Sequence, residues 1–65
     1  MTLAQQHVRD AEAAVRTAAI DVQVQAQRLR AFGLRELVNE LEAQAINLQE
    51  TADFLRDHLG LFEAP

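Results

Sequence analysis

The sequence predicts an all-α protein, in which two long helices fold back on each other as an antiparallel helical hairpin with its turn at Gly33. Apolar residues recur every three or four residues in both halves of the chain, which is the spacing of a helix face. Gly33 is the only glycine before Gly60, and no proline occurs before Pro65. Two helices leave one side of their apolar stripes uncovered, so we expect the hairpin to dimerise into a four-helix bundle.

The first helix is expected at about residues 2–31. Thr2 and Gln5 have the spacing of a capping box, which marks a helix start. Two core positions of a heptad pattern follow, and Ala19 and Ala26 widen the stripe. The first position takes Met1, Val8, Val15, Val22 and Leu29, and the second takes Ala4, Ala11, Ala18, Gln25 and Phe32.

Residues 20–27 conflict with a helix, because apolar and polar residues alternate there with the period of a β-strand. No second segment of the chain suits pairing with such a strand. An isolated strand would leave its backbone N–H and C=O groups without partners. Strong helix formers flank the segment on both sides, so we expect helix throughout.

The turn is expected at residues 32–33 and the second helix at about 34–59. Glycine adopts left-handed backbone conformations at no steric cost, so Gly33 suits a chain reversal. Gly60 is expected to cap the second helix and to begin a short tail at 60–65. The core positions of the second helix are Leu34, Leu41, Leu48, Leu55 and Phe62, together with Val38, Ala45, Ala52 and Leu59.

One continuous helix through Gly33 is the main structural alternative. An unbroken first heptad pattern would place Glu36, Ala43, Glu50 and Asp57 in the core. The apolar stripe of the second half is instead displaced by two residues, which is about 200° around a helix. On one straight helix the two stripes would face opposite ways, whereas in a hairpin they face each other.

Length and composition indicate one domain, residues 1–65, that needs a second copy for stability. A single core in a chain below roughly 70–80 residues is marginal without an added constraint. Cysteine is absent, so a disulfide cannot supply it. Oligomerisation remains, and we expect a homodimer. The chain is rich in alanine and arginine and has no lysine, which favours a GC-rich bacterial or phage genome.

Charge and hydropathy set expectations for location and partners. The net charge of −4 argues against general nucleic-acid binding. Four arginines against three acids give residues 1–31 a net charge of +1, and two arginines against seven acids give residues 32–65 a net charge of −5. The chain shows neither a signal-peptide pattern nor an apolar run of ~20 residues. We therefore expect a cytoplasmic protein with no membrane partner.

A row of polar residues recurs every seven residues on the outer side of the first helix. It consists of Arg9, Arg16, Gln23 and Arg30. Such a row can meet RNA phosphates or an acidic protein groove. The plainer interpretation is a solvated face with local ion pairs, because Glu12 is well placed for Arg9 and Arg16. We favour the plainer interpretation.

The second helix has an acidic side, and both helices carry apolar residues outside their core positions. The acidic residues Glu36, Glu40, Glu50, Asp53 and Asp57 suit a basic partner or simply solubility. The apolar residues outside the core positions are Ile20, Val24, Ile46 and Phe54. Together they are our candidate binding site for a partner protein, although scattered exposed apolar residues are also normal.

Nothing in the sequence indicates catalysis, and we expect no enzyme activity, cofactor or metal. His7 and His58 are the only histidines, and neither belongs to the Glu-x-x-His pair of di-iron helical bundles. Serine and cysteine are absent, so neither can act as a nucleophile beside a base. No glycine-rich phosphate loop is present.

The length, the central turn and the layers of alanine and leucine (Ala45 with Leu48, Ala52 with Leu55) resemble the Rop type of small RNA-binding dimer. This resemblance is one of architecture and implies a dimer of two hairpins. Our first functional hypothesis is a small regulatory or adaptor protein that binds a partner protein through the outer faces of the dimer. The alternatives are a Rop-like RNA binder that uses the arginine row, and a structural or assembly subunit of a larger particle.

Overall fold

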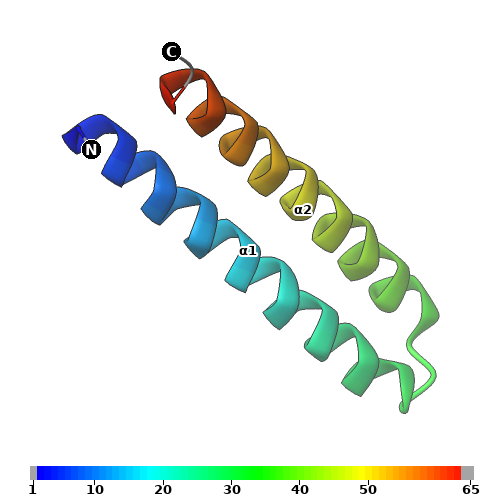
Figure 1. Ribbon diagram of the computed structural model, residues 1–65. Coiled ribbons are helices and arrows are strands. Elements are labelled where there is room, and N and C mark those ends of the chain that lie inside the picture. The colour runs from blue at the N-terminus through cyan, green and yellow to red at the C-terminus, as the bar shows by residue number, and fades with distance from the viewer. Residues whose placement is uncertain (1, 64–65) are drawn as a thin grey trace.

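The structure is a computed structural model that describes residues 2–63, with side chains described for residues 2–60. It contains two helices, α1 at Leu3–Arg30 and α2 at Arg35–Glu63. They lie side by side and antiparallel, with the turn at one end of the hairpin (Figure 1). No strand occurs between residues 2 and 63. The predicted all-α hairpin is confirmed, and one continuous helix is excluded.

α1 begins where its sequence indicates. Thr2 is the N-cap: its Oγ1 accepts a hydrogen bond from the Gln5 N–H at 3.1 Å, and its own N–H donates to Gln5 Oε1 at 2.7 Å. This reciprocal capping box satisfies two N–H groups that a helix start otherwise leaves without partners. Residues 20–27 are helical, so the flanking helix formers prevail over the strand-like alternation there.

Residues 31–34 connect the helices, and Gly33 reverses the chain. Its φ of +75° is the only positive φ among the described residues, and a residue with a Cβ would be strained in that conformation. The N–H groups of Phe32 and Gly33 donate to the carbonyl oxygens of Leu29 and Arg30 at 3.0 Å each. The turn predicted at residues 32–33 is confirmed. Phe32 itself, which we expected in the core, is 77% exposed.

α2 ends later than predicted. We expected Gly60 to cap the helix after Leu59 and to begin a tail, but α2 continues through Gly60 to Glu63. The backbone of Gly60 stays helical, without a positive φ. A glycine costs a helix interior only about 1 kcal/mol relative to alanine, which is too little to end a long helix by itself. The side chain of Phe62 and residues 64–65 lie outside the described part of the chain.

The buried core between the helices consists mainly of alanine. Among the described side chains, the buried apolar ones are Ala19, Ala26, Val38, Ala45, Ala52 and Leu59. Small residues let two helix backbones approach each other closely. The core positions predicted for α2 are confirmed for the buried Val38, Ala45, Ala52 and Leu59. They are also confirmed for the half-buried Leu41, Leu48 and Leu55. Leu34, which precedes α2, is exposed instead.

The prediction for α1 is correct for one core position and wrong for the other. Val8, Val15, Val22 and Leu29 are half-buried, as the first position requires, and Met1 lies outside the described residues. Ala19 and Ala26 form the second position, whereas the predicted Ala4, Ala11, Gln25 and Phe32 are exposed and Ala18 is half-buried. The reason is that the apolar stripe of α1 is three heptad positions wide, and a single neighbouring helix covers only two of them.

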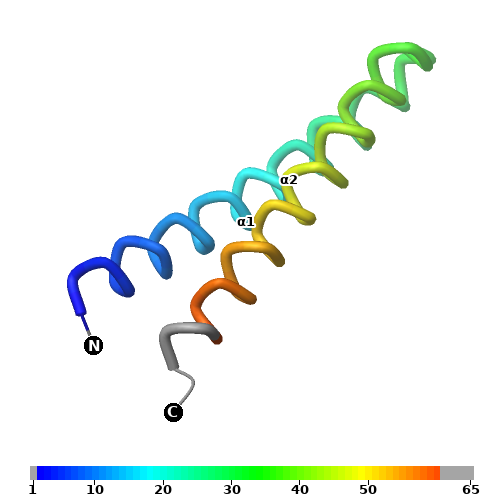
Figure 2. Tube along the Cα trace, turned by 90° about the horizontal axis from the view of Figure 1, so that it is seen from above, coloured from blue at the N-terminus to red at the C-terminus, as the bar shows by residue number. Residues whose placement is uncertain are grey.

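The hairpin is a rod. Its principal extents are 51 × 14 × 11 Å and its radius of gyration is 15.0 Å, whereas a compact chain of this length has a radius of gyration of about 11 Å. Two helices make only a single layer, and Figure 2 shows from above that they overlap near the turn and spread apart toward the N-terminal end of α1. Both broad sides of that layer are therefore surface. Over residues 2–63, neither helix contains a stretch long and apolar enough to cross a membrane.

Candidate functional site

One repeating pattern in both helices divides the surface of the hairpin into two broad faces. An apolar residue comes three places after each buried alanine, and a polar residue comes four places after it. The sets are Ala19 with Val22 and Gln23, Ala26 with Leu29 and Arg30, Ala45 with Leu48 and Gln49, and Ala52 with Leu55 and Arg56. Positions i+3 and i+4 lie on opposite sides of position i on a helix. Each buried row therefore has an apolar side and a polar side.

Ion pairs show that the polar sides of α1 and α2 lie on the same side of the hairpin. Arg16 Nη2 lies 3.3 Å from Asp53 Oδ1, and the Arg30 guanidinium pairs with the carboxylate of Glu42. We call this side the polar face. It carries Arg9, Arg16, Gln23 and Arg30 from α1, and Glu42, Gln49, Asp53 and Arg56 from α2.

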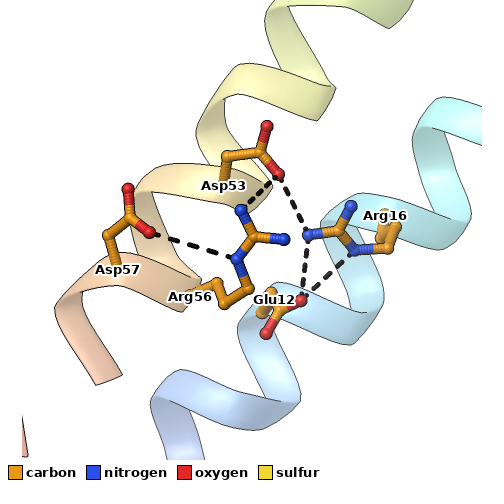
Figure 3. A network of polar contacts seen from close by, with 5 residues as sticks. All are labelled: Glu12, Arg16, Asp53, Arg56 and Asp57. Atoms are coloured by element: carbon orange, nitrogen blue, oxygen red, sulfur yellow. Dashed lines mark hydrogen bonds and ion pairs between the residues drawn. The ribbon is translucent and has the colours of Figure 1, made fainter. Parts of the chain in front are cut away.

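Arg16 is the centre of a polar network that joins the two helices (Figure 3). Its Nε and Nη2 donate to Glu12 Oε2 at 3.2 and 3.0 Å, and Nη2 also donates to Asp53 Oδ1. Asp53 Oδ1 also forms an ion pair with Arg56 Nη2 at 3.6 Å. Arg56 Nε in turn lies 4.0 Å from Asp57 Oδ1. The hydrogen bonds to Glu12 and then to Asp53 raise the pKa of Arg16 above its ordinary value.

The opposite side is apolar, and we call it the open face. Its central residues are Val8, Val15, Val22 and Leu29 from α1, and Leu41, Leu48 and Leu55 from α2. All of them are only half-buried, because the neighbouring helix covers each from one direction. Ala4, Ala11 and Ala18 border them on α1. The open face is therefore a continuous strip of apolar surface along the rod.

The structure places the predicted arginine row along the polar face and pairs much of its charge. Arg16 and Arg30 bind acidic side chains of α2. Gln23 and Arg30 line a shallow hollow of ≈ 350 Å³, together with Gln27, Glu42 and Ile46. Within the acidic side predicted on α2, Asp53 and Asp57 contact arginines, while Glu36, Glu40 and Glu50 are exposed.

The four apolar residues of the predicted partner site are exposed, but they do not share one face. Ile20 is 55% exposed, Val24 38%, Ile46 54% and Phe54 67%. By helical periodicity Ile20 and Ile46 lie toward the polar face, whereas Val24 and Phe54 point away from the other helix. Phe54 stacks on His58, with ring centroids 6.2 Å apart. These four residues therefore form separate apolar spots and no single patch.

A group of exposed apolar residues at the turn was not predicted from the sequence. Phe32, Leu34 and Leu37 are all exposed, within six residues of one another in the sequence. We had assigned Phe32 and Leu34 to the core. They are exposed because α1 ends at Arg30 and α2 begins at Arg35, so neither residue has a helix opposite it. The signal was available, because a core pattern that runs into a turn loses its facing helix.

The described residues contain no group of three His, Cys, Asp or Glu side chains arranged to hold a metal ion. In comparisons with known proteins, no protein-family model matches the sequence, and no curated protein or solved structure is similar to the chain. The comparisons therefore lend no support to the resemblance to Rop, which stays an expectation from the sequence.

Proposed function

We propose that this chain is a small non-enzymatic regulatory or adaptor protein, which dimerises through its open face into a four-helix bundle and binds another protein through its outer surfaces. One observation carries the proposal. The buried core is mostly alanine, whereas the larger residues Val15, Val22, Leu48 and Leu55 are only half-buried on the open face. A chain that places its larger apolar side chains on an uncovered side is built for association.

The exposed area supports a second copy on the open face. The hairpin exposes 4916 Å², whereas a compact monomer of 7.3 kDa exposes roughly 4,200 Å². The excess of roughly 700 Å² is close to the ~800 Å² that each partner buries in a standard protein interface. A second hairpin on this face would cover the half-buried leucines and valines from their uncovered side.

Leu48→Glu tests the dimer, because it places a charge in the middle of the open face. Sedimentation should show that the native chain is a dimer and that Leu48→Glu loses it. The matched control is Gln49→Glu, which adds the same charge at the adjacent half-buried residue on the polar face and should keep the dimer. The melting temperature of the native chain should rise with protein concentration. A folded native monomer at micromolar concentration would exclude this part of the proposal.

Val24 and Phe54 test partner binding, because both side chains point outward in a hairpin or in a dimer formed through the open face. A large apolar side chain contributes ~1.5–3 kcal/mol when it is buried, so Val24→Gln or Phe54→Glu should weaken a partner complex about ten-fold or more. Thr17 and Asn47 occupy the same heptad positions as Val24 and Phe54. Thr17→Gln and Asn47→Glu are therefore the matched controls. Pull-down with each dimeric variant is the measurement.

The same experiment separates the alternatives. Arg16→Glu reverses a charge in the arginine row and should abolish RNA binding, which falls steeply with salt. Loss of activity only in Arg16→Glu, with nucleic acid in the purified complex, would favour a Rop-like RNA binder. The pairing of Arg16 and Arg30 with acidic residues leads us to favour the protein partner. If none of the three variants has an effect, a structural subunit becomes the better proposal.

A further inference from the structure

We infer that two copies of the hairpin pack open face to open face with their turns at the same end, so that α1 of each copy lies on α2 of the other. This inference rests on the proposed dimer and specifies its arrangement. A two-fold dimer that joins the broad faces of two rods has two forms. The axis runs along the rods and places both turns at one end, or it runs across them and places the turns at opposite ends.

Side-chain size favours the same-end form. On the open face, α1 carries the small residues Ala4, Ala11 and Ala18, followed by Gln25, beside a row of three valines and Leu29, whereas α2 carries a row of leucines. The same-end form lays the alanine row of each copy against the leucine row of the other. The opposite-end form sets alanines against alanines and leucines against leucines. Helix interfaces reach native packing density by fitting large side chains against small ones.

The register within one hairpin shows how these rows would fit. The pairs Arg16–Asp53 and Arg30–Glu42 fix which residues of α1 and α2 lie at the same level. A two-fold axis along the rod adds no shift along it, so these levels also hold across the dimer. Ala18 of one copy then lies level with the space between Leu48 and Leu55 of the second copy. This is a knob-into-hole arrangement with a small residue where the two helices meet.

Charge favours the same form. α1 has a net charge of +1 and α2 has a net charge of −5. In the same-end form each α2 is flanked by the α1 helices of both copies. In the opposite-end form the two α2 helices, which are both acidic, lie directly against each other. Like charges across an interface disfavour association, and opposite charges favour it.

The same-end form also completes a surface that a single hairpin holds only in half. The exposed Phe32, Leu34 and Leu37 lie at the turn. With both turns at one end, the two sets form one apolar surface at that end of the dimer. In the opposite-end form the sets are separated by about the length of the rod, which is 51 Å.

Spin-label distances between the two copies distinguish the forms. The chain has no cysteine, so Ala31→Cys and Asn39→Cys each place one label near the turn, at exposed residues. The same-end form predicts a distance of roughly 10–25 Å between copies, because packed helix axes are about 8–10 Å apart. The opposite-end form predicts a distance near the 51 Å length of the rod for Ala31→Cys. For Asn39→Cys it predicts a distance roughly 20 Å shorter, because Asn39 lies six residues from Gly33 at 1.5 Å per residue in each copy. The control, Thr17→Cys near the middle of α1, gives a short distance in either form.

Each outcome decides a different point. Short distances at both turn sites and at Thr17→Cys support the same-end form. A distance near 50 Å at Ala31→Cys and of roughly 30 Å at Asn39→Cys, with a short one at Thr17→Cys, overturns this inference and leaves the dimer intact. No distance between copies at any site, with circular dichroism showing folded helices, overturns the dimer and this inference together.

Discussion

Arg16 of α1 reaches across the polar face and donates a hydrogen bond from Nη2 to Asp53 Oδ1 of α2 at 3.3 Å. The same guanidinium binds Glu12, and both contacts raise the pKa of Arg16, with the bond to Glu12 contributing most. A raised arginine pKa adds stability that is lost only as the pH rises through that pKa. This lies above the pH range in which folded proteins are usually studied. Salt is therefore a better variable than pH for testing this link.

Arg16→Gln should lower the melting temperature slightly at low salt, and the difference should shrink in 1 M salt, where the Debye length is about 3 Å. The effect is small because the pair is accessible to water. Arg28→Gln removes an exposed arginine of the same helix outside the polar face, and it should shift the melting temperature less. Equal shifts in the two variants, or a shift that salt does not reduce, would contradict the link between the helices.

Ala45→Leu should destabilise the protein by about 1–3 kcal/mol, because the added atoms enter a closely packed contact between two helix backbones. Ala45 is 1% exposed. The control is Ala43→Leu, an exposed position on the same helix, where the change should stay within about 0.5 kcal/mol. Urea unfolding at one fixed protein concentration measures both. Equal stability of the two variants would mean that Ala45 has room around it.

Gly33→Val should destabilise the turn by roughly 1–2 kcal/mol, since valine adopts a left-handed backbone with difficulty. An added Cβ at Gly33 meets no atom within 4 Å, so the cost comes from φ = +75° and not from a clash. Gly33→Asn should cost less, because asparagine tolerates this conformation better. The strained variant has a second outcome, which is opening into an extended or domain-swapped helix that sedimentation would detect.

Gly60→Ala should change the free energy of unfolding in the direction opposite to Gly33→Val and stabilise the protein by about 0.5–1 kcal/mol. Gly60 lies inside α2, has no positive φ, and would meet no atom within 4 Å if a Cβ were added. Thermal unfolding at matched concentrations gives the comparison with Gly33→Val. Destabilisation by Gly60→Ala would instead indicate that the helix ends at Gly60.

Thr2→Ala should cost about 0.5–2 kcal/mol, because it removes the hydroxyl that accepts from the Gln5 N–H. Thr17→Ala is the matched control: the same substitution in the middle of α1, at an exposed residue, should be neutral or slightly stabilising since alanine is the better helix former. Chemical denaturation of the two variants tests the capping box. A larger loss in Thr17→Ala would show that the N-cap contributes little.

Residue spacing predicted most of the fold, and its main error on α1 has a physical cause. Ala18 and Ala19 are adjacent and identical in type, so periodicity cannot say which of them faces α2. The choice depends on which side of α1 the second helix occupies. The contacts of Arg16 and Arg30 with α2 show that side, and they follow only from the register set by the turn.

The sequence predicted four apolar residues outside the core positions, but it predicted neither their arrangement nor the exposure of Phe32 and Leu34. Ile20, Val24, Ile46 and Phe54 all lie outside the core positions, and each is exposed. Whether they gather into one patch depends on the rotation of each helix about its own axis relative to the other. Heptad counting tells which residues share one side of a single helix. It does not tell how the two helices are rotated relative to each other, so the separation of Val24 from Phe54 could be seen only in the structure.

The alanine core makes the hairpin sensitive to mutation at its smallest side chains. A single base change in an alanine codon gives valine, threonine, serine, proline, glycine, aspartate or glutamate. Apart from glycine and serine, these residues force added bulk, a charge or a helix break into a position that is buried between the two helices. Ala19, Ala26, Ala45 and Ala52 are therefore the positions at which inherited variation should be most restricted. The leucines of the open face can change among apolar residues of similar size and keep their role.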